Sequence, residues 1–301
     1  MANIILLVVC LLAGMILRRT GRFPDSTPAV LNGFVIHLSL PAAALLFIHS
    51  LQLNSAMIFT PLMAWLLFGA AWLFFHLAGR LFSLPQRTVG ALVLVGGLGN
   101  TSFVGLPMIE AYYGRDWLGV GILADQLGSF MVLATLGILA ATLYSSGSAS
   151  PREMTRKVFS FPPFQALLLA LLLRPFTFPN WTTTVLHKLV ETITPLALAS
   201  VGFQLRFTSL RGLRRSLSLG LGYKLLVGPL LIALLYLGLI GLRGAVMQVT
   251  IFEAAMAPMI TAGIIAIDHD LDPPLVTMML GIGIPLSFAT LPVWAQLLRG
   301  F

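Results

Sequence analysis

Long apolar stretches follow one another along the whole chain, and charged residues, glycine and proline separate them. A helix needs about 20 mostly apolar residues to cross a bilayer. The stretches are too long and too uniformly apolar for the alternating strands of a membrane barrel. The pattern therefore predicts an all-α integral membrane protein with ten transmembrane helices. The predicted spans are residues 3–17, 29–49, 56–79, 88–112, 117–143, 162–178, 183–205, 217–241, 245–267 and 274–298.

The composition agrees with a chain embedded in a membrane. Only 9% of its 301 residues are charged, and the mean hydropathy is +0.96. A soluble domain carries roughly 25% charged residues, so this chain has too few charges for a water-facing surface. A net charge of +8 is also a feature of nucleic-acid-binding proteins. Lys and Arg in cytoplasmic loops explain this charge better, and no nucleic-acid partner is expected.

The basic residues also predict an orientation. With the N-terminus outside, the inner loops hold twelve Lys and Arg residues, and the outer loops and C-terminus hold five. Because positive residues collect on the cytoplasmic side, both termini are predicted to lie outside. The polar segment 145–161 is then a cytoplasmic linker between two halves, residues 1–144 and 162–301.

These two halves resemble each other. The fourth predicted span contains Pro107-Met108-Ile109-Glu110-Ala111 and the ninth contains Pro258-Met259-Ile260-Thr261-Ala262, with four of five residues identical at an offset of 151. The second and seventh spans carry Pro41 and Pro195, which are 154 residues apart. Each half is thus predicted to form the same five-helix unit. Since five is odd, the second unit would enter the membrane from the opposite side, giving the inverted repeat of many secondary carriers.

The fourth predicted span is a poor continuous helix. Between residues 96 and 107 it contains four glycines, three small polar residues and a proline. Paired breaks in the fourth and ninth spans would expose half-helix N-termini, which attract anions. The alternative is two kinked helices that pack closely through small residues. On the first interpretation the substrate-binding residues are Asn100, Thr101, Ser102, Gly105, Pro107, Ala257 and Pro258.

Charged residues inside the spans are candidates for ion coupling, because each costs roughly 2.5–3.5 kcal/mol near the bilayer centre. Asp125 and Glu253 fall at similar depths, so they could approach each other and share a proton. A local hydrogen bond could instead neutralise either one. Lys224 is the third candidate, although its long side chain could reach the headgroups. Glu110 is expected to pair with the nearby Arg115.

The sequence predicts no metal site, cofactor or catalytic residue. The segment 268–272, DHDLD, lacks the glycine and distal glutamate of a calcium loop. Asp272 precedes two prolines and is expected to cap the helix that follows. His37 could relay a proton, but a packing role is expected. Neither a nucleotide-binding loop nor an HExxH zinc motif occurs, and an intramembrane enzyme would need a paired catalytic set, which is missing.

Three segments are similar to the auxin efflux carrier family, which includes plant auxin carriers and bacterial permeases linked to malonate and malate. They are Asn32 to Pro41 (NGFVIHLSLP), Gly99 to Pro107 (GNTSFVGLP) and Glu253 to Pro258 (EAAMAP), and the similarity extends over the whole chain in matching order. The short linker resembles the bacterial members. Plant carriers have Gln at the position of Glu253, which argues against auxin as the substrate and leaves room for proton coupling. An additional residue also separates Met256 from Pro258.

The resemblance implies two inverted five-helix repeats with crossed, proline-broken fourth and ninth helices. It also implies a scaffold of helices one, two, six and seven beside a moving unit of helices three to five and eight to ten. Such elevator-type carriers often form homodimers through the scaffold. The implied location is the bacterial plasma (inner) membrane, and Asn100 is an implied substrate contact.

Together these observations predict a secondary active transporter of small mono- or dicarboxylates, with protons as the coupling ion, and not an enzyme. One alternative is a sodium-coupled organic anion symporter of the same fold, in which the carbonyl groups of the broken helices bind the ion. A membrane sensor or a channel is the alternative from another class. Besides its substrate and H+ or Na+, the protein is expected to contact membrane lipid.

Overall fold

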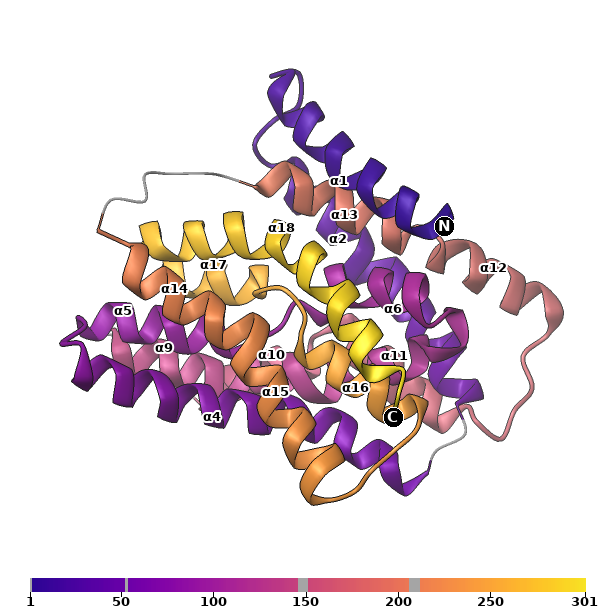
Figure 1. The fold of residues 1–301 in the computed structure, drawn as a ribbon. Coiled ribbons are helices and arrows are strands. Elements are labelled where there is room, and N and C mark those ends of the chain that lie inside the picture. Colours follow the sequence, from indigo (N-terminus) through magenta and orange to yellow (C-terminus); the bar gives the residue numbers. More distant parts are fainter. Residues whose placement is uncertain (1, 52–53, 146–150, 206–211) are drawn as a thin grey trace. The chain divides into compact units, whose positions relative to one another are not determined.

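The computed structural model describes residues 2–51, 54–145, 151–205 and 212–301 (Figure 1). Within these ranges the regular elements are helices, and an isolated antiparallel bridge joins Gly99 to Pro258. The predicted all-helical class is therefore confirmed. In the labels below, α denotes α-helical segments and η denotes π-helical or 3₁₀-helical segments.

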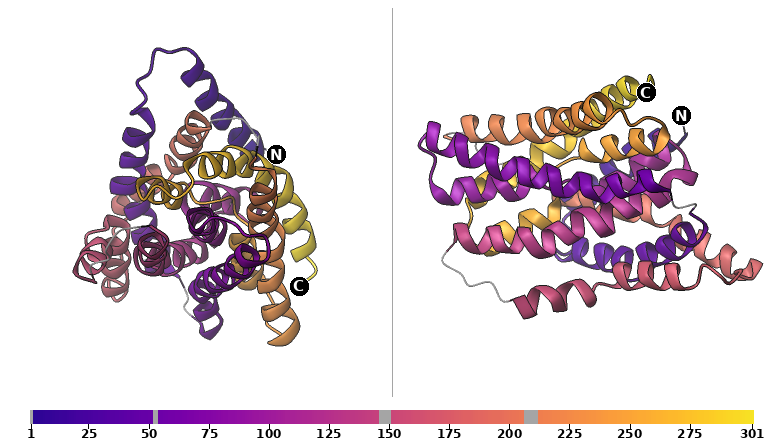
Figure 2. Two further views of the ribbon diagram at one scale, coloured as in Figure 1. Left: turned by 90° about the vertical axis from the view of Figure 1, so that its left-hand side faces the viewer. Right: turned by 90° about the horizontal axis from the view of Figure 1, so that it is seen from below.

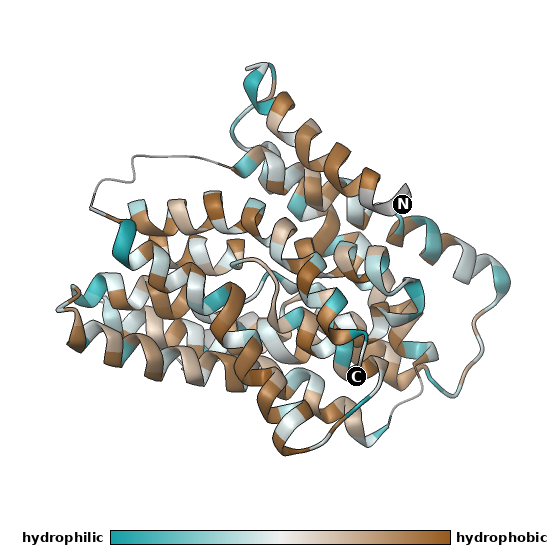
Figure 3. Ribbon diagram, viewed as in Figure 1, coloured by the Kyte–Doolittle hydropathy of each residue, from teal (hydrophilic) through white to brown (hydrophobic). Residues whose placement is uncertain are grey.

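Five helical stretches of the described chain are apolar and long enough to cross a membrane. One of these stretches contains α4 (Phe59–Leu81), and Figure 3 shows that this helix is mostly hydrophobic along its length. The five match the second, third, fifth, eighth and tenth predicted spans, whereas the total of ten stays a prediction. They are Thr27–Ile48, Ser55–Leu81, Arg115–Tyr144, Arg214–Leu239 and Pro273–Leu298.

The chain divides into two compact units, each built from segments of both sequence halves. Unit 1 comprises Met1–Asn54, Ser102–Ile122 and Lys157–Leu205. Unit 2 comprises Ser55–Thr101, Leu123–Arg156 and Arg206–Phe301. The division into repeats 1–144 and 162–301 stays a prediction.

Unit 1 contains four predicted spans, the first, second, sixth and seventh, together with the second part of the fourth span. Its helices are α1 (Ala2–Arg19), α2 (Thr27–Phe34), η1 (Val35–Ser39), α3 (Leu40–Ala43), η2 (Ala44–Ile48), α6 (Leu106–Tyr112), η6 (Arg115–Trp117), α11 (Pro162–Leu172), α12 (Asn180–Val190) and α13 (Ile193–Gln204). Three further elements extend across unit boundaries: η5 (Thr101–Gly105), α7 (Leu118–Leu123) and α10 (Pro151–Phe159).

Unit 2 is built around α4, against which α15, α16, η4 and η7 pack. The C-terminal helix α18 packs against α14 and α17 (Figures 1 and 2). The helices of unit 2 are η3 (Ser55–Ile58), α4, α5 (Gln86–Ala91), η4 (Leu92–Gly96), η7 (Ala124–Ser129), α8 (Phe130–Val132), η8 (Leu133–Gly137), α9 (Ile138–Tyr144), α14 (Arg214–Gly222), η9 (Tyr223–Val227), α15 (Gly228–Ala233), η10 (Leu234–Leu239), α16 (Ala245–Ala254), α17 (Ile260–Asp268) and α18 (Pro273–Leu298).

Two predicted spans differ from the observed helices, and proline accounts for both differences. The helix α11 ends at Leu172 and not at 178, because Pro175 disfavours the α conformation in the residue before it. The seventh span is two helices, α12 and α13, separated at residues 191–192. Pro195 lies in the first turn of α13, where a missing N–H is tolerated, and so it favours a new helix start.

The predicted linker 145–161 contains a helix that the sequence did not indicate, α10. Residues 146–150 of this linker lie outside the described residues, as do Arg206 and Arg211 of the predicted inner loops.

The first and last helices of unit 1, α1 and α13, pack closely against each other (Figure 1). A Cβ atom added at Gly14 would lie 2.0 Å from the carbonyl oxygen of Ala199, and one added at Gly202 would lie 2.0 Å from that of Leu11. Each helix thus places a glycine against the backbone of the other. Small residues permit this close approach of membrane helices.

We expect Gly202→Ala to destabilise the protein by about 1–3 kcal/mol, because the new methyl group would force the two backbones apart. Gly33→Ala is the matched control, since a Cβ atom there meets nothing within 4 Å. Thermal unfolding of the purified protein in detergent measures both. Equal melting temperatures for the two variants would contradict the glycine contact.

Candidate functional site

Two helices of unit 2 are interrupted, and the interruptions pair with each other. Residues 98–100 after η4 and residues 255–259 between α16 and α17 are not helical. The N–H of Asn100 donates to the carbonyl oxygen of Ala257 at 2.8 Å, and the N–H of Met259 donates to that of Leu98 at 3.1 Å. Backbone groups freed inside a membrane must find partners in the protein. The bridge provides partners for four such groups.

Glycines allow this backbone pairing to form among large neighbours. A Cβ atom at Gly97 would lie 2.9 Å from the ring of Phe68, and one at Gly99 would lie 3.2 Å from Nζ of Lys224. On the other side of the bridge, a Cβ atom at Gly283 would lie 2.8 Å from the ring of Pro258. The glycine-rich sequence is therefore required by space at the bridge.

Asp125 is buried beside the bridge and is satisfied by two hydrogen bonds. The hydroxyl of Thr101 donates to one carboxylate oxygen at 2.6 Å, and the amide of Gln126 donates to the other at 2.5 Å. The side chains of Asn100, Thr101 and Gln126 are also buried. Of the two interpretations of Asp125, neutralisation by local hydrogen bonds matches this geometry.

Lys224 is fully buried in η9, with 0% of its surface exposed. Its ammonium group donates to the carbonyl oxygen of Ala254, the last residue of α16, at 2.9 Å. A cation at this place interacts favourably with the negative end of the helix dipole. The interpretation that Lys224 reaches the headgroups is therefore wrong.

Glu253 differs from Asp125, because its carboxyl group is buried without hydrogen bonds. The residue is 1% exposed, and both side-chain oxygens lack a hydrogen-bond partner in the part of the chain that the structure describes. It interacts electrostatically with Asp125 and Lys224. A buried carboxylate without hydrogen bonds costs several kcal/mol or more, so this group is suited to binding a proton or a ligand.

Unit 2 thus contains seven of the candidate residues: Asn100, Thr101, Asp125, Lys224, Glu253 and the pair Ala257-Pro258 at the bridge. Ser102, Gly105 and Pro107 belong to unit 1, where Pro107 is buried in the first turn of α6.

Glu110 forms the predicted ion pair with Arg115 in unit 1, at 2.7 Å. Arg115 also contacts Glu191 at 3.2 Å, and the hydroxyl of Thr194 donates to Glu110 at 3.1 Å. These contacts give Glu110 a structural role.

The acidic segment 268–272 behaves as a helix start. The side chain of Asp272 accepts a hydrogen bond from the N–H of Leu275 at the beginning of α18, which confirms the predicted cap. Thr88 also donates to Asp272, at 2.7 Å, and Asp270 pairs with Arg87. Among the described residues, no group of three metal-ligating side chains is placed to hold an ion.

The sequence did not reveal a buried hydroxyl pair, Thr60 of α4 and Thr250 of α16, whose oxygens lie 2.8 Å apart. Each lies in a predominantly apolar span, which was the available signal.

A series of apolar helices with a buried polar centre defines this chain as a multi-pass integral membrane protein. A family model described as membrane transport protein matches residues 1–295, and the chain belongs to this family, the auxin efflux carrier family that the motifs resemble. An uncharacterized transporter of Methanothermobacter thermautotrophicus is 28% identical over 300 residues, covering 98% of this chain and 97% of the relative. An uncharacterized transporter of Methanocaldococcus jannaschii is 24% identical over 310 residues, with coverage of 98% and 97%. The protein is therefore a membrane transporter.

We expect Thr101→Val to destabilise the protein by about 1–3 kcal/mol, because Asp125 would lose a buried donor. Thr101→Ser keeps the hydroxyl group and should lose less. Thermal unfolding in detergent distinguishes the variants. A valine variant as stable as the wild type would contradict a stabilising hydrogen bond from Thr101 to Asp125.

Proposed function

We propose that this protein is a proton-coupled secondary transporter of small organic anions, mono- or dicarboxylates. The observation that carries the proposal is the buried Glu253 carboxyl group, which has no hydrogen-bond partner among the described residues and interacts with Lys224 beside the backbone bridge.

The substrate class follows from the positive character of this region. The helix α17 begins at Ile260, directly after the bridge, so its first N–H groups have no acceptor within the helix. Such a helix start attracts anions. The backbone N–H groups of Asn100 and Met259 donate to the bridge and are not available for substrate. A carboxylate substrate would therefore bind the first turn of α17 and the side chain of Asn100.

Coupling to protons follows from competition for the charge of Lys224. When Glu253 is ionised, its negative charge offsets that of Lys224 and opposes an incoming anion. When Glu253 carries a proton, the charge of Lys224 is left to attract the substrate. Proton binding and anion binding then favour each other, which is the condition for symport.

The contacts of the bridge favour protons over sodium as the coupling ion. A sodium site at the broken helices would use their backbone carbonyl oxygens as ligands. Those of Leu98, Ala254 and Ala257 already accept hydrogen bonds, and the donor to Ala254 is the ammonium group of Lys224. The side-chain nitrogen of Lys224 would compete with a sodium ion for this carbonyl oxygen.

Alternating access would follow an elevator mechanism. Unit 2, which carries the site, would move the substrate, and unit 1 would remain in place as a scaffold through which two copies form a homodimer. The two inverted repeats, the ten spans and the outward termini belong to the same proposal. Membership of this family and the whole-chain match to transporters support it.

We expect reconstituted wild-type protein to exchange labelled malonate or malate in a saturable manner. Asn100→Ala should reduce this counterflow about tenfold or more, because a buried hydrogen bond to a charged group would be lost. Asn180→Ala, which changes an exposed asparagine of unit 1, is the control. Exchange that never saturates would indicate a channel, and full exchange by Asn100→Ala would move the site elsewhere.

Replacement of Glu253 should separate transport from coupling. In Glu253→Gln we expect counterflow to persist, whereas uptake driven by an inward proton gradient should no longer accumulate substrate. Glu191→Gln, which alters an exposed ion pair, should accumulate substrate as the wild type does. A sodium gradient should not drive accumulation of substrate by Glu253→Gln or by Glu191→Gln. Accumulation driven by sodium, or by protons in Glu253→Gln, would contradict proton coupling at this residue.

A further inference from the structure

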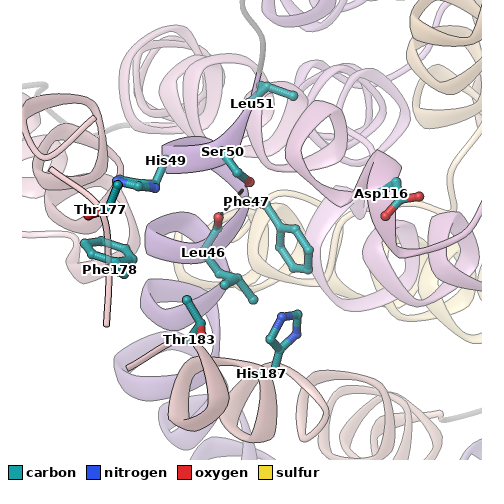
Figure 4. Close-up of a pocket in the computed structure, with 10 residues that line it drawn as sticks. All are labelled: Leu46, Phe47, His49, Ser50, Leu51, Asp116, Thr177, Phe178, Thr183 and His187. Atoms are coloured by element: carbon teal, nitrogen blue, oxygen red, sulfur yellow. Dashed lines mark hydrogen bonds between the residues drawn. The ribbon is translucent and has the colours of Figure 1, made fainter. Parts of the chain in front are cut away.

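A cavity of about 610 Å³ opens in unit 1, and its residues have no part in the proposed transport site. Its walls come from the end of the helix Thr27–Ile48, from the residues that follow it, from Asp116 and from α12 with the segment before it (Figure 4). Ligand-binding pockets commonly have volumes of about 300–1,000 Å³. The cavity therefore has the size of a small-molecule site.

Two pairs of aromatic rings line this cavity. His49 stacks on Phe178 with ring centroids 4.1 Å apart and planes at 16°, and Phe47 meets His187 edge to face at 6.4 Å. Figure 4 shows the two pairs on either side of Leu46. Aromatic faces carry partial negative charge and attract cations.

The polar groups of the cavity offer acceptors to a ligand. The hydroxyl of Ser50 donates to the backbone carbonyl oxygen of Leu46 at 3.0 Å. The hydroxyl of Thr183 donates to the backbone carbonyl oxygen of Asn180 at 2.9 Å. Each has used its hydrogen, so lone pairs remain for a ligand. His49 Nε2 lies 2.7 Å from the carbonyl oxygen of Phe176, which can only accept, so this nitrogen carries the hydrogen. In the neutral ring Nδ1 is then an acceptor as well.

An acidic side chain lines this cavity, and an arginine lies at its rim. Asp116 contributes a carboxylate, and the neighbouring Arg115 is already paired with Glu110 and Glu191 at 2.7 and 3.2 Å. Arg174 donates to the backbone carbonyl oxygen of Leu51 at 2.9 Å, on the rim of the cavity. A cation within the cavity would therefore meet one carboxylate, several acceptors and aromatic faces.

We propose that this cavity binds an organic ammonium cation with an apolar body. An ammonium group has three donors and no acceptor, which matches the lone pairs of Ser50, Thr183 and His49. Its charge matches Asp116, and its apolar body matches Phe47 and Phe178. The same chemistry occurs in a soluble amine and in the headgroup of phosphatidylethanolamine. The proposal does not depend on the transported substrate.

The test is calorimetric titration of the purified protein in dodecyl maltoside with 2-phenylethylammonium. We expect saturable binding that Asp116→Asn weakens about fivefold, the effect of losing one partly exposed charge pair. Asp25→Asn, which removes an exposed carboxylate of unit 1 away from the cavity lining, should bind as the wild type does. Phe47→Leu should weaken binding because it keeps apolar volume but removes a ring.

The charge-reversed probe 3-phenylpropanoate has nearly the same shape and should not bind. Equal binding of this anion, no saturable binding of the amine, or equal effects of Asp116→Asn and Asp25→Asn would overturn the proposal. Adding phosphatidylethanolamine, with phosphatidylglycerol as the control lipid, distinguishes the sources. Competition by the former alone identifies the lipid headgroup as the ligand, and unchanged amine binding identifies a soluble amine.

Discussion

The structure of the site depends on one backbone interaction, the bridge between residues 98–100 and 257–259. Two hydrogen bonds, from Asn100 to Ala257 and from Met259 to Leu98, hold two interrupted helices together. Inside a membrane the freed backbone groups could not turn to bulk water, so each break would be costly without the other. The glycines at 97, 99 and 283 follow from this constraint, because larger residues would collide with the bridge or its neighbours.

The bridge also creates the electrostatic setting for three buried charged residues. One helix end that it leaves, the carbonyl of Ala254, is capped by Lys224. Asp125 receives hydrogen bonds from Thr101 and Gln126, whereas Glu253 receives none among the described residues. Two carboxylates of similar burial therefore differ in chemistry. Asp125 is held by its two donors, and Glu253, without a donor among the described residues, is the group that we propose to bind the coupling proton.

Unit 1 has a different kind of stability from unit 2. Its helices α1 and α13 are in contact through reciprocal glycines, and the ion pairs of Arg115 tie α6 to residue 191 at the end of α12. These contacts are backbone packing and surface charge, without a buried ionic group at their centre.

Local features of the sequence determined much of this protein. The apolar stretches predicted the all-helical class, and the glycines and prolines indicated both helix breaks. The cap formed by Asp272 and the ion pair of Glu110 with Arg115 were also predicted from neighbouring residues. Only the tertiary structure decided that Thr101 donates a hydrogen bond to Asp125 and that Lys224 caps the end of α16. It also left Glu253 without a hydrogen-bond donor among the described residues. It also decided that His49 and His187 line one cavity. Caps and breaks depend on a few adjacent residues, whereas the partners of a buried side chain are set by helices that lie far apart in sequence and meet only when the chain folds.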